Sequence, residues 1–276
     1  MRGTYALALL GICFGSFVNA FVWRLHELEI GKKLSKKRKR ELSITRGRSM
    51  CVHCRHELAW YDLLPVISWL NLRGKCRYCG LKIDDSPLTE LLTTGLFVWS
   101  YLAWPYGFTS TGWLLFGIWL VFLVGFMALA VYDLRWMELP NKVVYPLIAL
   151  AVVQVLPRAF LAHDSLAPIR GAVLGFLVIG GLFYGLFQLS GGKWIGGGDV
   201  KLAFMIGPLV GGAMASLMVI FLASMIGTLV SLPLLVRKSL KPSSHIPFGP
   251  FLLFATVIVY LYGEKILDWY TGGLFY

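Results

Sequence analysis

The sequence predicts an all-α polytopic membrane protein, and two observations carry this prediction. Apolar residues occupy 57% of the 276 positions and charged residues only 14%, whereas roughly 25% of the residues in a soluble domain are charged. The apolar residues also gather into runs close to the ~20 residues that a helix needs to cross a bilayer. This composition excludes an ordinary soluble domain.

The apolar runs predict about eight transmembrane helices. The sixth run is short and holds Gly207 and Pro208, so we expect it to be broken or buried among other helices. In chain order, the runs are Thr4–Trp23, Leu88–Trp104, Gly112–Tyr132, Val143–Leu161, Gly171–Leu189, Val200–Gly212, Ala213–Val236 and Phe251–Tyr270.

The basic residues predict the topology. The first run lacks the basic start and the small-residue cleavage pattern of a signal peptide, so it is interpreted as a retained helix. With its N-terminus outside, all but four of the 26 Lys and Arg residues fall on the cytoplasmic side, as the positive-inside rule requires. The predicted segments are a first transmembrane helix at 1–23, a cytoplasmic basic and metal-binding loop at 24–87, and a transmembrane core at 88–276.

The net charge of +12 is explained by this loop without a nucleic-acid partner. Its run KKLSKKRKR, residues 32–40, follows closely behind a membrane span. A basic cluster in that position is attracted to anionic lipid. Membrane-surface anchoring is therefore the preferred interpretation, and a solvated stretch that only sets the topology is the alternative.

Two cysteine pairs in the same loop predict a structural zinc site. The motifs CVHC and CRYC place Cys51, Cys54, Cys76 and Cys79 on two tight turns, which together offer a tetrahedral set of thiolates. The spacer between the pairs is slightly longer than the usual ~15–20 residues. Disulfides are the rival interpretation, but a cytoplasmic loop is reducing. Four protein ligands leave no open position for a catalytic water.

Other residues near the knuckles are expected to play no part in the metal site. His53 and His56 lie beside the first pair and are alternative ligands only if a cysteine is not used. Cys13 lies within the first span and is interpreted as a small core residue.

The segment between the knuckles, WYDLLPVISWL at residues 60–70, is too short to span a membrane. Its Trp60, Tyr61 and Trp69 are residue types that settle at a membrane interface. The sequence leaves two interpretations open: a segment lying on the membrane surface, or the core of a small soluble subdomain clamped by metal.

Two carboxylates at the predicted cytoplasmic ends of their helices are the candidate catalytic residues. Asp133 ends the third span and Asp199 follows three glycines before the sixth. A carboxylate at the edge of the hydrocarbon is costly and therefore a functional candidate. Two carboxylates sharing a site cannot both ionise easily, so one keeps a proton while the other takes one from water. This is the machinery of an aspartic protease.

Each aspartate also has a structural interpretation. Asp133 could pair with Arg135 or Lys142, and Asp199 could cap a helix N-terminus. Glu138 is a second candidate for the place of Asp133.

Five blocks of the sequence carry a resemblance to a known family. The chain resembles the type IV prepilin leader peptidases, polytopic aspartic proteases of the GxGD class. The resemblance covers nearly the whole length and rests on five blocks in family order: GSFVNAFVWRL, the cysteine knuckles around WYDLLPVISWL, DLRWMELPN, GGGDVK and PFGPFL.

The resemblance implies a function and its site residues. Asp133 and Asp199 would form the catalytic pair, with Gly196 and Gly198 letting substrate backbone approach and Lys201 biasing which acid holds the proton or contacting lipid phosphate. The family removes a short basic leader from prepilins or pseudopilins after a glycine, on the cytoplasmic side of the bacterial inner membrane. Members with all four cysteines often then methylate the new N-terminus with S-adenosylmethionine. The sequence shows no glycine-rich turn for that cofactor.

Two other classes of function fit part of the sequence. A non-enzymatic zinc-bearing membrane scaffold for a pilus or secretion machine would use the cysteines and the basic loop, but it leaves the paired aspartates unexplained. A proton-coupled transporter would more often place its acids near the bilayer midplane.

Overall fold

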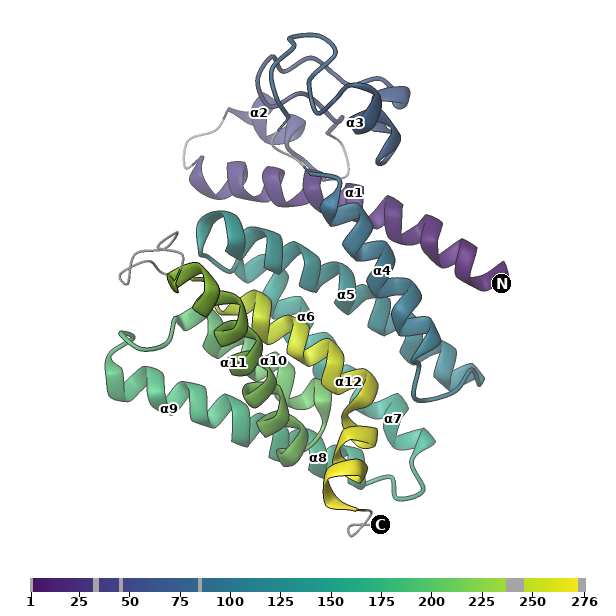
Figure 1. The fold of residues 1–276 in the computed structure, drawn as a ribbon, viewed down its shortest axis with the longest axis vertical. Helices are drawn as coiled ribbons and strands as arrows, with labels where there is room; N and C mark the ends of the chain where they lie inside the picture. Colours follow the sequence, from purple (N-terminus) through teal and green to yellow (C-terminus); the bar gives the residue numbers. More distant parts are fainter. Residues whose placement is uncertain (1, 32–34, 45–46, 84–85, 237–245, 273–276) are drawn as a thin grey trace. The chain divides into compact units, whose positions relative to one another are not determined.

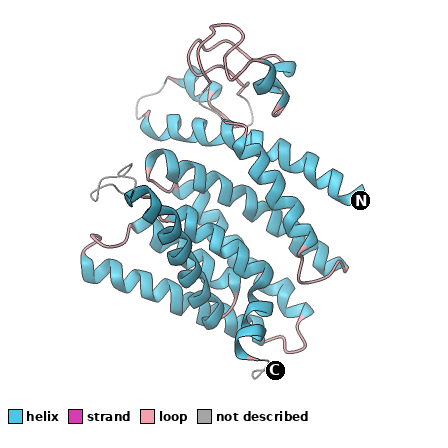
Figure 2. Ribbon diagram, viewed as in Figure 1, coloured by secondary structure: helices cyan, strands magenta, loops and turns pink. Residues whose placement is uncertain are grey.

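The computed structural model describes residues 2–31, 35–44, 47–83, 86–236 and 246–272. Over these ranges the regular structure is helical, apart from two isolated β-bridges (Figure 1, Figure 2). The chain divides into two compact units, Met1–Leu102 and Ala103–Tyr276. Lys32, Lys33, Arg46, Arg237, Lys238 and Lys241, which the topology prediction used, lie outside the described residues.

The first unit is built on two helices that pack closely, α1 (Arg2–Ile30) and α4 (Leu88–Leu102). Gly11 and Gly15 lie one turn apart on α1, where any side chain would collide with the backbone of Thr94 and Glu90 on α4. This is the small-xxx-small arrangement that brings helix backbones together in membranes. The structure thus groups α4 with α1, whereas the sequence analysis counted residue 88 as the start of the core.

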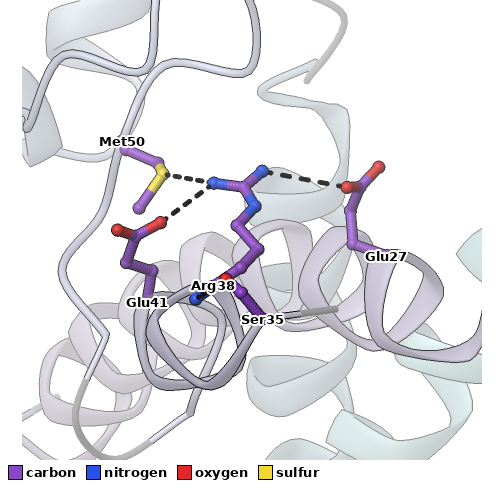
Figure 3. Close-up of polar contacts among 5 residues, drawn as sticks. All are labelled: Glu27, Ser35, Arg38, Glu41 and Met50. Atoms are coloured by element: carbon purple, nitrogen blue, oxygen red, sulfur yellow. Dashed lines mark hydrogen bonds and ion pairs between the residues drawn. The ribbon is translucent and has the colours of Figure 1, made fainter. Parts of the chain in front are cut away.

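The chain between these helices holds three short helices and the two cysteine turns. The helices are α2 (Lys36–Glu41), the 3-10 helix η1 (Trp60–Leu63) and α3 (Ile67–Asn71). Within the basic run, Arg38 turns inward: its guanidinium lies 3.9 Å from Glu27 of α1 and 3.3 Å from Glu41 (Figure 3). Its described basic neighbours on α2 remain exposed, so they stay available for lipid.

The second unit contains the remaining helices. They are α5 (Ser110–Trp136), α6 (Asn141–Val153), α7 (Val155–Leu161), α8 (Ala167–Gly175), the π-helical turn η2 (Phe176–Gly180), α9 (Gly181–Ser190), α10 (Gly197–Val210), α11 (Ala213–Val236) and α12 (Gly249–Thr271). The pairs α6–α7 and α8–α9 each run on as one apolar stretch, Asn141–Leu161 and Ala167–Ser190.

Helix α10 lies among the other helices of this unit, in contact with α6, α8, α9, α11 and α12. Most of its residues from Val200 to Leu209 are buried. Gly207 and Gly175 of α8 meet backbone to backbone, leaving no room for a side chain at either position. The expectation that the short sixth run is buried is confirmed.

Six helical stretches of the described chain are long and apolar enough to cross a membrane. They coincide with six of the eight predicted spans. The other two correspond to α4, with 15 residues, and α10, with 14, which are shorter than a usual span. The protein is therefore a multi-pass membrane protein, and a count of eight spans stays a prediction.

Candidate active site and metal centre

Asp133 lies in the last turn of α5 and is 6% exposed. The helix ends at Met137, which adopts the left-handed conformation (φ 54°) and donates its backbone N–H to the Asp133 carbonyl. This termination leaves the Asp133 side chain on the buried face of the last turn. Glu138, the alternative candidate, lies beyond the helix end and is exposed, so the burial favours Asp133.

Asp199 lies in the first turn of α10, where the helix dipole favours a negative charge. The N-cap is Gly196 rather than Asp199, so the interpretation of Asp199 as the capping residue is wrong. A Cβ on Gly198 would lie 2.8 Å from Leu139 Cδ1, whereas one on Gly196 would make an ordinary contact of 3.6 Å with Asp199 Oδ2. Gly198 therefore serves close packing of the loop.

The start of α10 is tied to the segment that follows α5. Gly198 packs against Leu139, and Lys201 Nζ donates to Asn141 Oδ1 at 2.7 Å. These contacts bring together the helix ends that carry the two aspartates, close enough for their charges to interact, although the two residues are distant in the sequence. The pairing of Asp133 and Asp199 as a catalytic dyad stays a prediction.

The start of α12, at Gly249, is the third segment that lies at this site. The backbone amide of Gly249, at the start of α12, hydrogen-bonds the Asp133 carboxylate. A Cβ at Gly249 would lie 2.5 Å from Asp133 Oδ2 and 3.5 Å from Leu202 Cδ1. The sequence predicted PFGPFL only as one block of the family resemblance and predicted no contact for it. The available signal was a glycine set between two Pro–Phe steps.

The four knuckle cysteines form a single cluster, with all their sulfur atoms within 4.8 Å of one another. The two turns are built alike. Cys51 N donates to His56 O and Cys76 N to Leu81 O, and the bridges Met50–Glu57 and Lys75–Lys82 close each turn. Each turn needs a left-handed residue after its second cysteine, Arg55 (φ 59°) and Gly80 (φ 70°). The cluster suits a tetrahedral metal ion such as zinc.

The neighbouring residues lie outside this cluster, as expected. His53 Nε2 lies 3.2 Å from the Lys82 carbonyl oxygen and so links the two turns. The ring of His56 lies against that of Tyr78, 3.8 Å between centroids. Cys13, in contrast, is exposed on α1, so its interpretation as a core residue is wrong.

Metal analysis is expected to find about one zinc ion per chain in the purified protein, because four thiolates fill a tetrahedral site. Replacing Cys76 and Cys79 by Ser should reduce the zinc content to near zero. Inductively coupled plasma mass spectrometry of freshly reduced protein measures both. A metal-free wild-type sample would contradict the assignment of the cluster.

The segment between the knuckles is held through Asp62. Its carboxylate accepts hydrogen bonds from Arg77 Nε (2.8 Å) and Tyr78 OH (3.0 Å) on the second knuckle. Burial raises the pKa of Asp62, but the bonds from Arg77 and Tyr78 outweigh it and hold the pKa below its usual value. Trp60 is 75% exposed, so this aromatic side chain is not part of a subdomain core.

Comparison with known families and proteins adds to this geometry. Residues 9–104 match the model of the bacterial peptidase A24 N-terminal domain, and residues 119–232 match that of the type IV leader peptidase family. The prepilin leader peptidase/N-methyltransferase of Pseudomonas aeruginosa is 32% identical over 274 residues, covering 95% of this chain and 91% of the relative. The protein of the same name from Stutzerimonas stutzeri is 31% identical over 271 residues, covering 94% and 90%. No solved structure gives a significant match.

Proposed function

The chain belongs to the type IV leader peptidase family, and we propose that it is an aspartic endopeptidase that uses Asp133 and Asp199 to remove the basic leader of prepilins or pseudopilins after a glycine. The family membership makes it a prepilin-processing peptidase. The observation that carries the catalytic assignment is the meeting of Asp133, Asp199 and Gly249 from three separate helix ends.

The two carboxylates divide the work of hydrolysis. The ionised acid takes a proton from a water, whose oxygen attacks the scissile carbonyl carbon, while the protonated acid donates to the carbonyl oxygen. Collapse of the tetrahedral intermediate breaks the carbon–nitrogen bond, and the leaving amine takes up a proton. The Gly249 amide fixes the orientation of Asp133.

The proposed orientation places both aspartates at the cytoplasmic face of the bacterial inner membrane. The apolar helix of a prepilin would lie in the bilayer beside the spans, with its scissile bond at the interface, where water can reach it. Anionic lipid would contact the exposed basic residues of α2.

We further propose that the protein methylates the new N-terminal amine with S-adenosylmethionine. The support is the name of the relatives, which join leader peptidase and N-methyltransferase, together with the intact cysteine cluster. Cys51, Cys54, Cys76 and Cys79 would hold a structural zinc ion that fixes the fold of the loop. A scaffold without catalysis would not need two carboxylates at neighbouring helix ends, the buried Asp133 and the half-buried Asp199.

The direct test is incubation of the purified, detergent-solubilised protein with a prepilin. Loss of the leader shows as a mobility shift on a gel, and mass spectrometry of the product locates the cleaved bond. Cleavage after a residue other than glycine, or none, would overturn the proposal.

Replacing Gly249 by Ala is expected to reduce the rate of leader removal about tenfold or more, because the added methyl group would displace the Asp133 carboxylate, and small displacements in an active site are costly. The matched control is Gly185→Ala on α9, where a Cβ would meet open space and cleavage should be unchanged. Initial rates of cleavage measure both variants. A Gly249→Ala enzyme as fast as Gly185→Ala would remove Gly249 from the active site.

A further inference from the structure

A cavity of about 550 Å³ lies within the first unit, between α1 and the metal-binding loop. Its volume is within the ~300–1,000 Å³ of small-molecule sites. The walls come from α1, from described residues after α2 between Ile44 and Val52, from the segment between the knuckles, and from Glu90 near the start of α4. The residues that line it all belong to residues 1–102, so the cavity is separate from the aspartate pair.

The lining joins two sequence blocks that the peptidase chemistry does not use. GSFVNAFVWRL supplies Ser16, Asn19 and Arg24, and WYDLLPVISWL supplies Asp62 and Ser68. The first block is part of α1 and the second contains η1 and most of α3, yet polar residues of both line one cavity.

The buried polar groups of this cavity suit a ligand that has hydrogen-bond donors and carries both charges, because the buried Glu90 and Arg24 both line it. Asn19 is 6% exposed, and its Nδ2 donates to Ser86 O while its Oδ1 is buried with no hydrogen-bond partner. A buried acceptor without a partner is costly. Glu90 is 7% exposed and accepts from Val66 N at 2.6 Å. Asp62 also lines the cavity, but its carboxylate is already paired with Arg77 and Tyr78.

The backbone at Val66 is shaped to meet Glu90. Val66 has φ 59° and ψ −50°. A positive φ is rare for a β-branched residue. Ile67 N donates to Pro65 O across it. The turn aims the Val66 N–H at Glu90 and so holds that carboxylate at the cavity wall. Strained backbone of this kind is concentrated at functional sites.

We infer that this cavity is the methyl-donor site and binds a sulfonium nucleoside of the S-adenosylmethionine type. The positively charged groups of such a donor, its sulfonium and its ammonium, suit the Glu90 carboxylate. The carboxylate of its amino-acid part suits the guanidinium of Arg24, which a bond to Ser43 O holds in the lining. Phe17, Phe21 and Trp23 offer apolar and aromatic surface for a purine ring.

The chemistry in this cavity is a methyl transfer that needs no further reactant. The donor, when bound, supplies a methyl group on a positively charged sulfur. The new N-terminal amine, after losing a proton to water, forms a nitrogen–carbon bond with its lone pair as the carbon–sulfur bond breaks and leaves its electron pair on sulfur. The positive charge passes from sulfur to nitrogen, so charge and atoms balance.

This inference rests on the methylation half of the proposed function, and its test reads binding as well as activity. Isothermal titration of the solubilised full chain with S-adenosylmethionine, without any pilin, gives the Kd. The variants are Asn19→Leu, which removes the unpaired acceptor, and Glu90→Gln, which keeps an acceptor for Val66 but removes the charge. Each is expected to raise the Kd about tenfold or more. Asn71→Ala is the matched control, since Asn71 is exposed in the same unit, and zinc content reports folding.

The outcomes separate this inference from the proposed function. Weakened binding in both variants with unchanged Asn71→Ala supports the cavity as the donor site. Wild-type binding that both variants retain would overturn the location and leave the methyltransferase intact. Variants that bind the donor normally but show a raised KM for the cleaved pilin would assign the cavity to the peptide instead. A wild-type protein that cleaves prepilin but binds no donor would overturn both this inference and the methylation proposal, while the peptidase stands.

Discussion

Replacing either Asp133 or Asp199 by Asn is expected to abolish leader removal while leaving membrane insertion intact. Asn matches Asp in size, so the helix ends should keep their packing, but an amide neither takes a proton from water nor donates one as an acid. Loss of general acid–base catalysis costs roughly 10²- to 10⁴-fold, and loss of the water-activating group should bring cleavage below detection. The measurement is the fraction of prepilin processed over time by each purified variant.

The matched control for this experiment is Glu138→Gln. Glu138 lies close in sequence to Asp133 but is exposed beyond the end of α5, so its variant should cleave at the wild-type rate. Substantial cleavage by Asp133→Asn or Asp199→Asn would remove that residue from the mechanism. Loss of cleavage in Glu138→Gln alone would transfer the role of Asp133 to Glu138.

The position of each aspartate was predictable because it depends on local sequence. Each acid lies at the end of an apolar run, and the predicted topology puts both ends at the same face. Their approach to one another depends on tertiary contacts, Gly198 on Leu139 and Lys201 on Asn141. Composition cannot supply such contacts, so the sequence offered the pair as a hypothesis among structural alternatives.

The contribution of Gly249 was not predictable in the same way. Its role lies in a backbone amide and in the lack of a side chain, so the signal was a glycine between two Pro–Phe steps and not a chemically reactive side chain. The packing of α4 against α1 was also not predictable from the sequence. Its apolar length resembles one more core span, but the two glycines of α1 select it as a close-packing partner.

The metal cluster of the loop, in contrast, was predictable from local sequence alone. The spacing of the cysteines was sufficient to predict the cluster, because each CxxC turn fixes its own geometry through local hydrogen bonds. The loop also forms the wall of a cavity with α1, and that depends on where the loop lies against the helix. Whatever chemistry this unit performs should therefore depend on the metal more strongly than the aspartate pair does.

Replacing both Cys76 and Cys79 by Ser is accordingly expected to damage methylation more than proteolysis. Loss of the metal should unfold a loop whose folding energy comes largely from coordination. Asp133, Asp199 and Gly249, in contrast, are positioned by helices of the second unit, whose packing uses no metal ligand. The expected product in cells carrying the double variant is a cleaved pilin with an unmethylated N-terminus, with methylation reduced at least about tenfold, as metal-site losses commonly are.

Mass spectrometry of the mature pilin distinguishes the outcomes, because a missing methyl group and a retained leader give different masses. Chelation of the zinc from wild-type protein is the companion experiment, since it removes the metal without changing any side chain. Both treatments should give the same product. Uncleaved prepilin in either one would contradict the separation and show that the loop also guides the basic leader to the aspartates, since the described helices that carry Asp133 and Asp199 would remain folded.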